Sequence, residues 1–325
     1  MQVSSSIKSP LTVFLEMQGF LLLDGGLATE LEKRGHNLNT KLWSAGLLNS
    51  HPDEIRAVHR AYLEAGADCI ISATYQATVP GFMEAGLSEK EAKSLIQKAV
   101  AIARDARDEY FASCRNGNRG KTRPLIAASI GPYGAYLADG SEFRGNYSIS
   151  PQQLRAFHES RWEILADSGA DLFACETIPS LAEALVLRDL MKATPDVFAW
   201  VSFSCIDGQR ISDGTPIREC TALFEECEQV VAVGINCTAP KFIPSLITEA
   251  RKGTPTKPVV VYPNLGETYD DTKRAWIGAS ESVNFAKAAI EWFQLGARLL
   301  GGCCRTTPNH IAEMRSSLLS LQKPA

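Results

Sequence analysis

The feature that most constrains this chain is an alternation of short apolar runs with longer amphipathic stretches, repeated eight times along its 325 residues. The apolar runs contain few polar residues, which is typical of parallel strands covered on both faces. The predicted strands are Phe20–Asp24, Cys69–Thr74, Leu125–Ile130, Leu172–Glu176, Phe198–Ser204, Val230–Asn236, Val259–Pro263 and Arg298–Gly302. Eight such units indicate an α/β chain that closes into one (β/α)8 TIM barrel, with an open doubly wound sheet as the second possibility.

Helical stretches separate these strands, with apolar residues at three- and four-residue spacing. Examples are Asp53–Ala65, Glu89–Phe111, Gln152–Ser168, Leu181–Ala193 and Ser282–Leu295. Ser88, Ser150, Ser180 and Thr307 stand where N-caps are expected. Gly66, Gly169 and Gly296 each follow a helix and precede a strand, as a C-terminal glycine in the left-handed conformation does. The recurrence of a glycine at the same position between helix and strand favours one series of βα units over unrelated domains.

The chain is accordingly predicted to form a single domain. Residues 1–17 are interpreted as an N-terminal extension with a short helix, and residues 18–325 as the barrel. Gly131–Tyr147 is the longest excursion and a candidate lid over the barrel mouth. The apolar stretch Leu11–Met17 is short and contains Glu16, which makes it a poor secretory signal. We therefore expect a cytoplasmic protein.

The charge balance limits the kinds of partner. The net charge is −4, and acidic and basic residues are interspersed, with no basic block that would favour nucleic acid or an anionic membrane. No apolar run reaches the 18 residues that a membrane-spanning helix needs. We expect a monomer that binds small neutral or zwitterionic molecules.

Functional groups of such a barrel belong at the carboxyl ends of its strands. Polar or sulfur-containing residues, in one case with two glycines, lie at the carboxyl ends of six of the eight predicted strands. They are Asp24, Gly25 and Gly26, then Thr74 and Tyr75, Glu176 and Thr177, Asn236 and Cys237, Tyr262 and Asn264, and Cys303 and Cys304. This accumulation predicts a site at the barrel mouth.

The nine cysteines divide into two groups by position. Cys69, Cys114, Cys175, Cys205, Cys220 and Cys227 are interpreted as packing residues. Cys237 follows the sixth strand, and Cys303 and Cys304 follow the eighth, so all three sulfurs can reach a common mouth. Three protein ligands with a fourth position open are typical of catalytic zinc, and thiolates favour Zn²⁺ over magnesium or calcium. A Cys303–Cys304 disulfide is the alternative.

A thiolate-rich zinc is a poor activator of water but suits a fourth thiolate supplied by a substrate. A free thiol is only a few per cent ionised near neutral pH, and coordination removes its proton. None of the five histidines stands at a predicted strand end, which argues against a metallohydrolase. Two other possibilities stay open. A zinc-binding sensor would need a fourth protein ligand, for which Cys205 is the candidate, and a redox protein would use Cys303 and Cys304.

Three blocks of the sequence resemble those of homocysteine S-methyltransferases. They are Asp24–Glu32 (DGGLATELE), Gly234–Thr238 (GINCT) and Gly301–Thr306 (GGCCRT). The resemblance extends over nearly the whole chain and includes the segments around His51–Asp68 and Cys175–Thr177. It implies that Cys237, Cys303 and Cys304 are zinc ligands and that Asp24, Gly25 and Glu176 lie near the amino acid part of homocysteine. A carboxylate can pair with its ammonium, while backbone N–H groups around Gly25 and Gly26 can hold its carboxylate.

The resemblance also implies an activity, in which homocysteine receives a methyl group on sulfur and becomes methionine. The chain is too short for appended folate and cobalamin domains, which favours the short type that uses S-methylmethionine, with S-adenosylmethionine as a lesser donor. A sulfonium cation could rest against the ring of Trp43 or Tyr75. Asn236 is interpreted as a residue that orients a ligand without binding the metal itself. A selenocysteine Se-methyltransferase would share every motif and is the alternative within the class.

Overall fold

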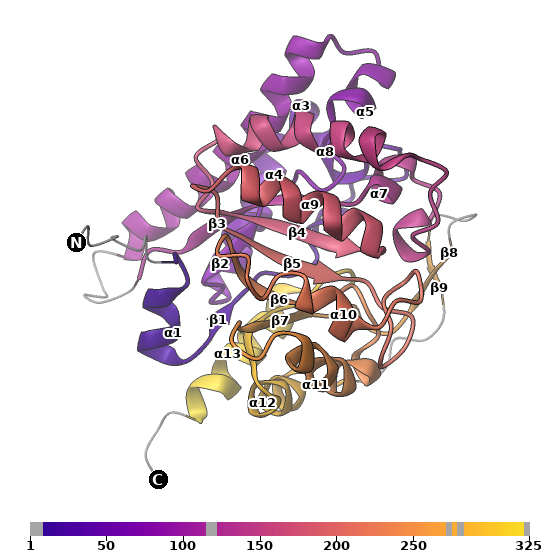
Figure 1. Cartoon of the computed structure of the whole chain (residues 1–325). Helices are drawn as coiled ribbons and strands as arrows, with labels where there is room; N and C mark the ends of the chain where they lie inside the picture. The colour runs from indigo at the N-terminus through magenta and orange to yellow at the C-terminus, as the bar shows by residue number, and fades with distance from the viewer. Residues whose placement is uncertain (1–8, 115–121, 271–274, 278–282, 322–325) are drawn as a thin grey trace, which may run out of the picture.

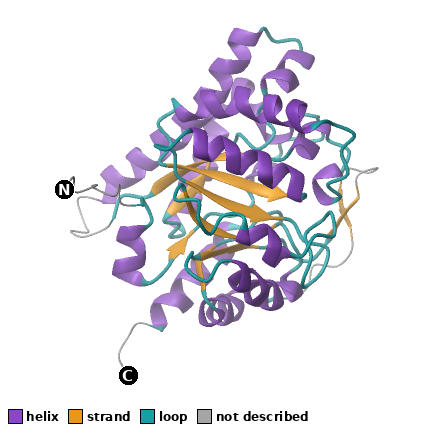
Figure 2. Ribbon diagram, viewed as in Figure 1, coloured by secondary structure: helices purple, strands orange, loops and turns teal. Residues whose placement is uncertain are grey.

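The structure is a computed structural model that describes residues 9–114, 122–270, 275–277 and 283–321. Eight parallel strands form a barrel enclosed by helices (Figures 1 and 2). The strands are β1 (Leu21–Leu22), β2 (Cys69–Ile71), β3 (Leu125–Ile130), β4 (Leu172–Ile178), β5 (Ala199–Phe203), β6 (Val230–Asn236), β7 (Val259–Tyr262) and β10 (Ala297–Leu300). Every predicted strand is present, and the barrel prediction is confirmed.

Closure of the barrel distinguishes it from the open sheet. The hydrogen-bonded order runs β1-β10-β7-β6-β5-β4-β3-β2. The two outer strands of this order meet through a parallel bridge between Leu23 and Cys69. The carboxylate of Asp68 reinforces this seam, because its Oδ2 accepts hydrogen bonds from Leu22 N (2.9 Å) and Arg315 Nη1 (2.7 Å).

Helices follow the strands around the barrel and cover its outer face. The principal ones are α4 (Pro52–Glu64), α6 (Glu89–Cys114), α8 (Pro151–Ala166), α9 (Leu181–Ala193), α10 (Ile217–Ala222), α11 (Ile243–Gly253), α12 (Phe285–Leu295) and α13 (Pro308–Ser320). The five predicted helices agree with α4, α6, α8, α9 and α12 to within three residues at each end. The proposed start of the last one, Ser282, lies outside the described residues, and α12 is capped by Asn284.

The predicted helix boundaries show the capping hydrogen bonds and the glycine conformations that were expected. The hydroxyl oxygens of Ser88, Ser150 and Ser180 each accept a hydrogen bond from the backbone N–H three residues later. Thr307 forms a capping box with His310. The three helix-ending glycines adopt φ values of +103° at residue 66, +79° at 169 and +114° at 296, in the left-handed region that favours glycine.

The amino-terminal end of the barrel is closed by α1 (Thr12–Gln18). Leu11 and Phe14 are buried and belong to the apolar cluster inside the barrel, together with Leu21, Leu299 and Trp200. A barrel of this size is filled by side chains rather than open. These contacts tie the amino-terminal helix to the barrel core.

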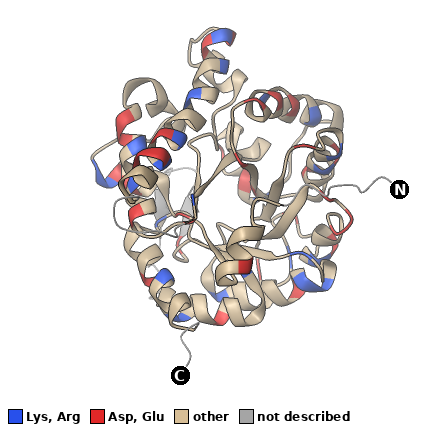
Figure 3. Ribbon diagram, turned by 90° about the vertical axis from the view of Figure 1, so that its left-hand side faces the viewer, with Lys and Arg blue, Asp and Glu red and all other residues tan. Residues whose placement is uncertain are grey.

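The remaining elements extend the βα connections. They are α2 (Leu27–Lys33), η1 (Trp43–Gly46), α3 (Leu47–Ser50), α5 (Val79–Glu84), α7 (Tyr133–Leu137), η2 (Ser141–Phe143), η3 (Pro240–Phe242) and the antiparallel pair β8 (Thr268–Asp270) and β9 (Ala275–Ile277). The candidate lid segment contains α7 and η2. None of the described helices is long and apolar enough to cross a membrane. Acidic and basic residues intermingle on the outer helices in Figure 3, in line with the absence of a basic block in the sequence.

Candidate active site

A cavity of about 420 Å³ opens at the carboxyl ends of the strands. Most of the predicted site residues line it, namely Asp24, Gly25, Gly26, Trp43, Tyr75, Glu176, Thr177, Cys237, Cys303 and Cys304. Asn236 is fully buried behind its wall. Ala138, Glu142 and Phe143 from the candidate lid segment also line the cavity, as does His36 from the loop after α2. The structure therefore brings the sequence-predicted residues to one place.

The three cysteines converge at the inner end of this cavity. Cys237 directly follows β6, and Cys303 and Cys304 follow β10. The Sγ–Sγ distances are 2.9 Å for Cys303–Cys237, 3.5 Å for Cys237–Cys304 and 4.0 Å for Cys303–Cys304. All three are free cysteines, so the adjacent pair is not a disulfide. Among the described residues, this is the one group of three or more potential metal ligands whose ligand atoms lie within 4.8 Å of one another, and Cys205 is outside it.

The cluster has the donor set and the spacing for a soft metal. Tetrahedral thiolate sites with metal–sulfur bonds of about 2.3 Å place their sulfurs about 3.8 Å apart. Two of the observed separations bracket that value, and the Cys303–Cys237 pair needs to open by about 0.9 Å. The pKa of Cys304 falls to about 5 because Cys237 and Cys303 donate hydrogen bonds to its sulfur. The donor set, the sulfur spacing and the lowered pKa of Cys304 all fit a site that could bind a soft metal ion.

Two glycines allow the loop after β1 to approach the cysteine loop. A Cβ on Gly25 would lie 2.7 Å from Thr306 Oγ1, and one on Gly26 would lie 2.9 Å from the backbone oxygen of Cys303. Gly26 N donates a hydrogen bond to Thr306 Oγ1. Asp24, before them, accepts a hydrogen bond from Ile71 N at 2.8 Å, and burial raises its pKa well above the usual range.

Glu176 lies at the end of β4 and is 7% exposed. Burial, and to a smaller extent the nearby sulfur of Cys303, raise its pKa to about 8 even though a hydrogen bond donated by Ser129 Oγ acts in the opposite direction. Ser129 is fixed in β3, so its hydroxyl orients the carboxylate. A buried carboxylate of this kind favours a cationic group of a ligand as its partner.

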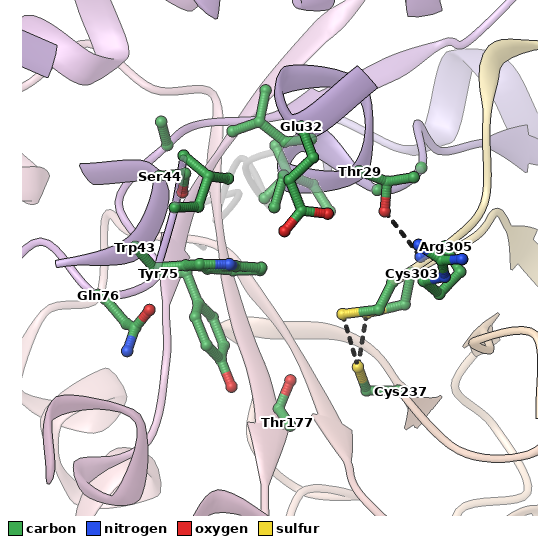
Figure 4. Close-up of a pocket in the computed structure, with 18 of the residues that line it drawn as sticks. Thr29, Glu32, Trp43, Ser44, Tyr75, Gln76, Thr177, Cys237, Cys303 and Arg305 are labelled. Atoms are coloured by element: carbon green, nitrogen blue, oxygen red, sulfur yellow. Dashed lines mark hydrogen bonds between the residues drawn. The ribbon is translucent and has the colours of Figure 1, made fainter. Parts of the chain in front are cut away.

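Asn236 acts on Thr177 rather than on the cysteines. Its Oδ1 accepts a hydrogen bond from Thr177 N and its Nδ2 donates one to Thr177 Oγ1, both at 2.7 Å. Thr177 has φ of +61°, at an irregularity in the pairing of β4 with β5. The amide therefore holds a strained backbone position and turns the threonine side chain toward the cavity (Figure 4).

Strained backbone is concentrated at this cavity. Five described residues other than glycine have positive φ, and all five line it: Trp43, Ala138, Thr177, Cys237 and Arg305. Such conformations cost free energy and persist where the surroundings enforce them, which is common at functional sites. The sequence gives no signal for this feature, because none of these residue types requires that conformation.

The outer part of the cavity is aromatic. The rings of Trp43 and Tyr75 meet edge to face with centroids 5.9 Å apart, and the Tyr75 hydroxyl points toward Thr177 (Figure 4). The buried Arg161 of α8 donates hydrogen bonds to the backbone oxygens of Tyr75 (3.1 Å) and Gly131 (2.6 Å). It thereby fixes the connections after β2 and β3, which wall the cavity. Arg161 lies in the middle of a helix, so its sequence position did not reveal this role.

The match to a family model decides the classification. The model described as homocysteine S-methyltransferase matches residues 21–318. The chain belongs to the homocysteine S-methyltransferase family. The chain is 50% identical to homocysteine S-methyltransferase YbgG of Bacillus subtilis, covering 97% of this chain and 99% of that protein. It is 47% identical to a selenocysteine methyltransferase of Astragalus bisulcatus, covering 98% of each chain.

A solved structure agrees with this classification. The metallated form of the Escherichia coli homocysteine methyltransferase MmuM superposes with a TM-score of 0.84 at 46% identity, covering 95% of this chain and 99% of that one. Membership of the homocysteine S-methyltransferase family makes the protein a methyltransferase, as the resemblance of its three sequence blocks predicted. The fold and the enzyme class are therefore established.

Proposed function

We propose that this protein transfers a methyl group from S-methylmethionine to the sulfur of L-homocysteine and that Cys237, Cys303 and Cys304 hold the required Zn²⁺. The observation that carries the proposal is the convergence of these three sulfurs at the inner end of the cavity. Three thiolates are a preferred donor set for zinc, and three protein ligands characterise catalytic rather than structural zinc sites. When bound, zinc supplies the charge that keeps a substrate thiol ionised at neutral pH.

The residues around the cluster suit the amino acid part of homocysteine. We assign Glu176 to the ammonium, because its carboxylate is held by Ser129 and reaches the cavity close to Cys303. The backbone of Gly25 and Gly26 is assigned to the carboxylate. Thr177, positioned by Asn236, completes this inner half. The barrel of residues 18–325 would thus carry the whole reaction.

The donor is assigned to the outer, aromatic half of the cavity. Trp43 and Tyr75 can contact a sulfonium cation, which gains about 0.5–2 kcal/mol over an aromatic face. Transfer breaks one S–CH3 bond, whose electron pair stays on the donor sulfur and leaves a neutral thioether. No general acid is therefore needed. A donor close in chemistry, S-adenosylmethionine, is expected to be used less well.

The acceptor could also be selenocysteine, since a selenocysteine methyltransferase is 47% identical over nearly the full length. Both acceptors present a soft, easily ionised group to the same three sulfurs. Two other relatives are named homocysteine S-methyltransferases, which favours homocysteine as the acceptor. The monomeric state and the cytoplasmic location stay predictions.

A panel of donors and acceptors tests this function. With zinc, homocysteine labelled in its carbon chain should be converted to labelled methionine by S-methylmethionine, faster than by S-adenosylmethionine. Anionic methyltetrahydrofolate should give none, since the cavity is lined by more carboxylates than basic groups. Selenocysteine turnover far above that of homocysteine would overturn the assigned acceptor, and absence of product with both sulfonium donors would overturn the assigned donor.

Glu176→Gln should stabilise the metal-free protein while weakening homocysteine binding. The folded protein raises the pKa of Glu176 from 4.5 to about 8. Below pH 4.5 the carboxyl is protonated in both the folded and the unfolded chain, so it does not lower the free energy of unfolding. As pH rises from 4.5 toward 8, only the unfolded chain loses the proton easily, and the free energy of unfolding falls. The variant should therefore gain roughly 4 kcal/mol of unfolding free energy at pH 7.5, which lies about three pH units above the ordinary value, and almost nothing at pH 4.5. Urea unfolding at both pH values measures this difference.

The control for this comparison is Glu159→Gln, which changes an exposed carboxylate that pairs with Arg155 on the surface of α8. It should show no comparable pH-dependent gain. An equal effect of Glu176→Gln at both pH values would contradict the electrostatic cause. An unchanged KM for homocysteine would contradict the assignment of Glu176 to the ammonium.

A further inference from the structure

Glu32 is a carboxylate at the cavity that the proposed reaction leaves without a role. It lies on α2, which begins directly after the glycine loop, and it lines the outer part of the cavity. Figure 4 shows its carboxylate pointing into the cavity, on the side where the Trp43 ring and the Cys303 sulfur also face. The side chain forms no hydrogen bond or ion pair with any described residue.

The neighbouring charges do not neutralise it. Arg305 is the basic residue that acts on Glu32 electrostatically, but its Nε donates a hydrogen bond to Glu267 Oε2 at 2.9 Å. Glu32 is exposed to solvent at the rim of the cavity, and the part of the carboxyl that faces the cavity wall is desolvated enough to raise its pKa. A negative group in this setting gains most from a cation brought by a ligand.

The aromatic side chains beside it complete a cation-binding arrangement. Trp43 is held at φ +47° and packs edge to face against Tyr75. A carboxylate next to aromatic faces attracts sulfonium and ammonium ions through charge and through the ring quadrupole together. Glu176 cannot serve the same purpose, since it is buried in the inner half and hydrogen-bonded to Ser129.

We propose that Glu32 recognises the positive charge of the methyl donor and so distinguishes the sulfonium substrate from the neutral thioether left after transfer. This inference rests on the proposed function. S-methylmethionine and methionine share the same amino acid part and differ by one methyl group and one positive charge. When the S–CH3 bond breaks, the electron pair neutralises the donor sulfur, and the homocysteine sulfur forms the new S–CH3 bond. Glu32 then loses the charge that it binds, which favours product release.

The test compares Glu32→Gln with Glu30→Gln, a matched change two residues earlier on the same helix. Glu30 pairs with Lys33 at 2.9 Å and does not line the cavity. Glu32→Gln should raise the KM for S-methylmethionine about tenfold, roughly 1.4 kcal/mol, with kcat, the homocysteine KM and zinc content unchanged. The inhibition constant of methionine against the donor should change less than twofold. Glu32→Asp should recover part of the donor affinity, and Glu30→Gln should resemble the unsubstituted protein.

Calorimetry on the metal-free protein gives a second readout that does not depend on turnover. S-methylmethionine should bind the unsubstituted protein more tightly than methionine, and Glu32→Gln should remove most of that preference. Equal weakening of both ligands, or an unchanged donor KM, would overturn the role of Glu32. If the unsubstituted protein neither bound nor used S-methylmethionine, the proposed donor would fail instead, so the two failures are distinguishable.

Discussion

Replacing Cys304 with serine is expected to lower methyl transfer at least about 100-fold and to reduce bound zinc well below one equivalent. Even residues that only support a metal ligand contribute about 10–100-fold, so loss of a ligand should cost at least as much. A serine hydroxyl stays protonated at neutral pH and is a poor ligand for a soft site. In the structure, Cys304 also accepts hydrogen bonds from both other cysteines, so its removal disrupts the whole cluster.

Cys205→Ser is the matched control for this substitution. Cys205 is the cysteine that the sequence offers as a fourth ligand, it follows β5 near the same end of the barrel, and it is not part of the three-sulfur group. Zinc content and activity should remain close to those of the unsubstituted protein. Full activity in Cys304→Ser, or zinc loss in Cys205→Ser, would show that the ligand set is wrongly assigned.

The second large effect is expected from Gly234→Ala, which acts on the fold and not on the chemistry. Gly234 lies in β6 opposite Val260 of β7, and a Cβ there would lie 1.9 Å from the Val260 backbone oxygen. Two backbones of one closed barrel cannot separate locally, so the substitution should destabilise the protein by about 3 kcal/mol or more. Urea unfolding of the metal-free protein measures the loss, and poor recovery of folded protein is the extreme form of the same result.

Gly46→Ala is the control, since a Cβ at that glycine meets only ordinary contacts of 3.7–3.8 Å and its φ is negative. Its unfolding free energy should change by less than about 1 kcal/mol. A Gly234→Ala protein as stable as Gly46→Ala would contradict the close approach of β6 and β7.

Most of the fold could be predicted because it depends on repeated local signals. Each strand is an apolar run, and capping residues such as Ser150 and Ser180 mark helix starts by a hydrogen bond that needs no tertiary contact. The β8–β9 pair was missed, since each of its strands is only three residues long. The contribution of Leu11 and Phe14 to the inner core was also missed, because burial there depends on packing against the barrel end.

Only the site residues that lie at the ends of predicted strands could be predicted from the sequence. Glu176 lies near the carboxyl end of β4, and Cys237, Cys303 and Cys304 follow β6 and β10 within four residues, so the barrel rule places all four at one mouth. Asn236 was assigned to the right region, but its contact with Thr177 depends on a backbone irregularity that the sequence does not encode locally. Glu32 lies on a helix, where a charged residue ordinarily faces solvent, and only the tertiary structure shows that its carboxylate faces the cavity.

The central claim is that three cysteines hold a zinc ion that accepts the substrate thiol. X-ray absorption at the zinc edge, with and without homocysteine, tests it most directly. We predict three sulfur neighbours and one lighter atom in the zinc-loaded protein, changing to four sulfurs at about 2.3 Å when homocysteine is added. A coordination sphere that homocysteine leaves unchanged in an active preparation would contradict the account.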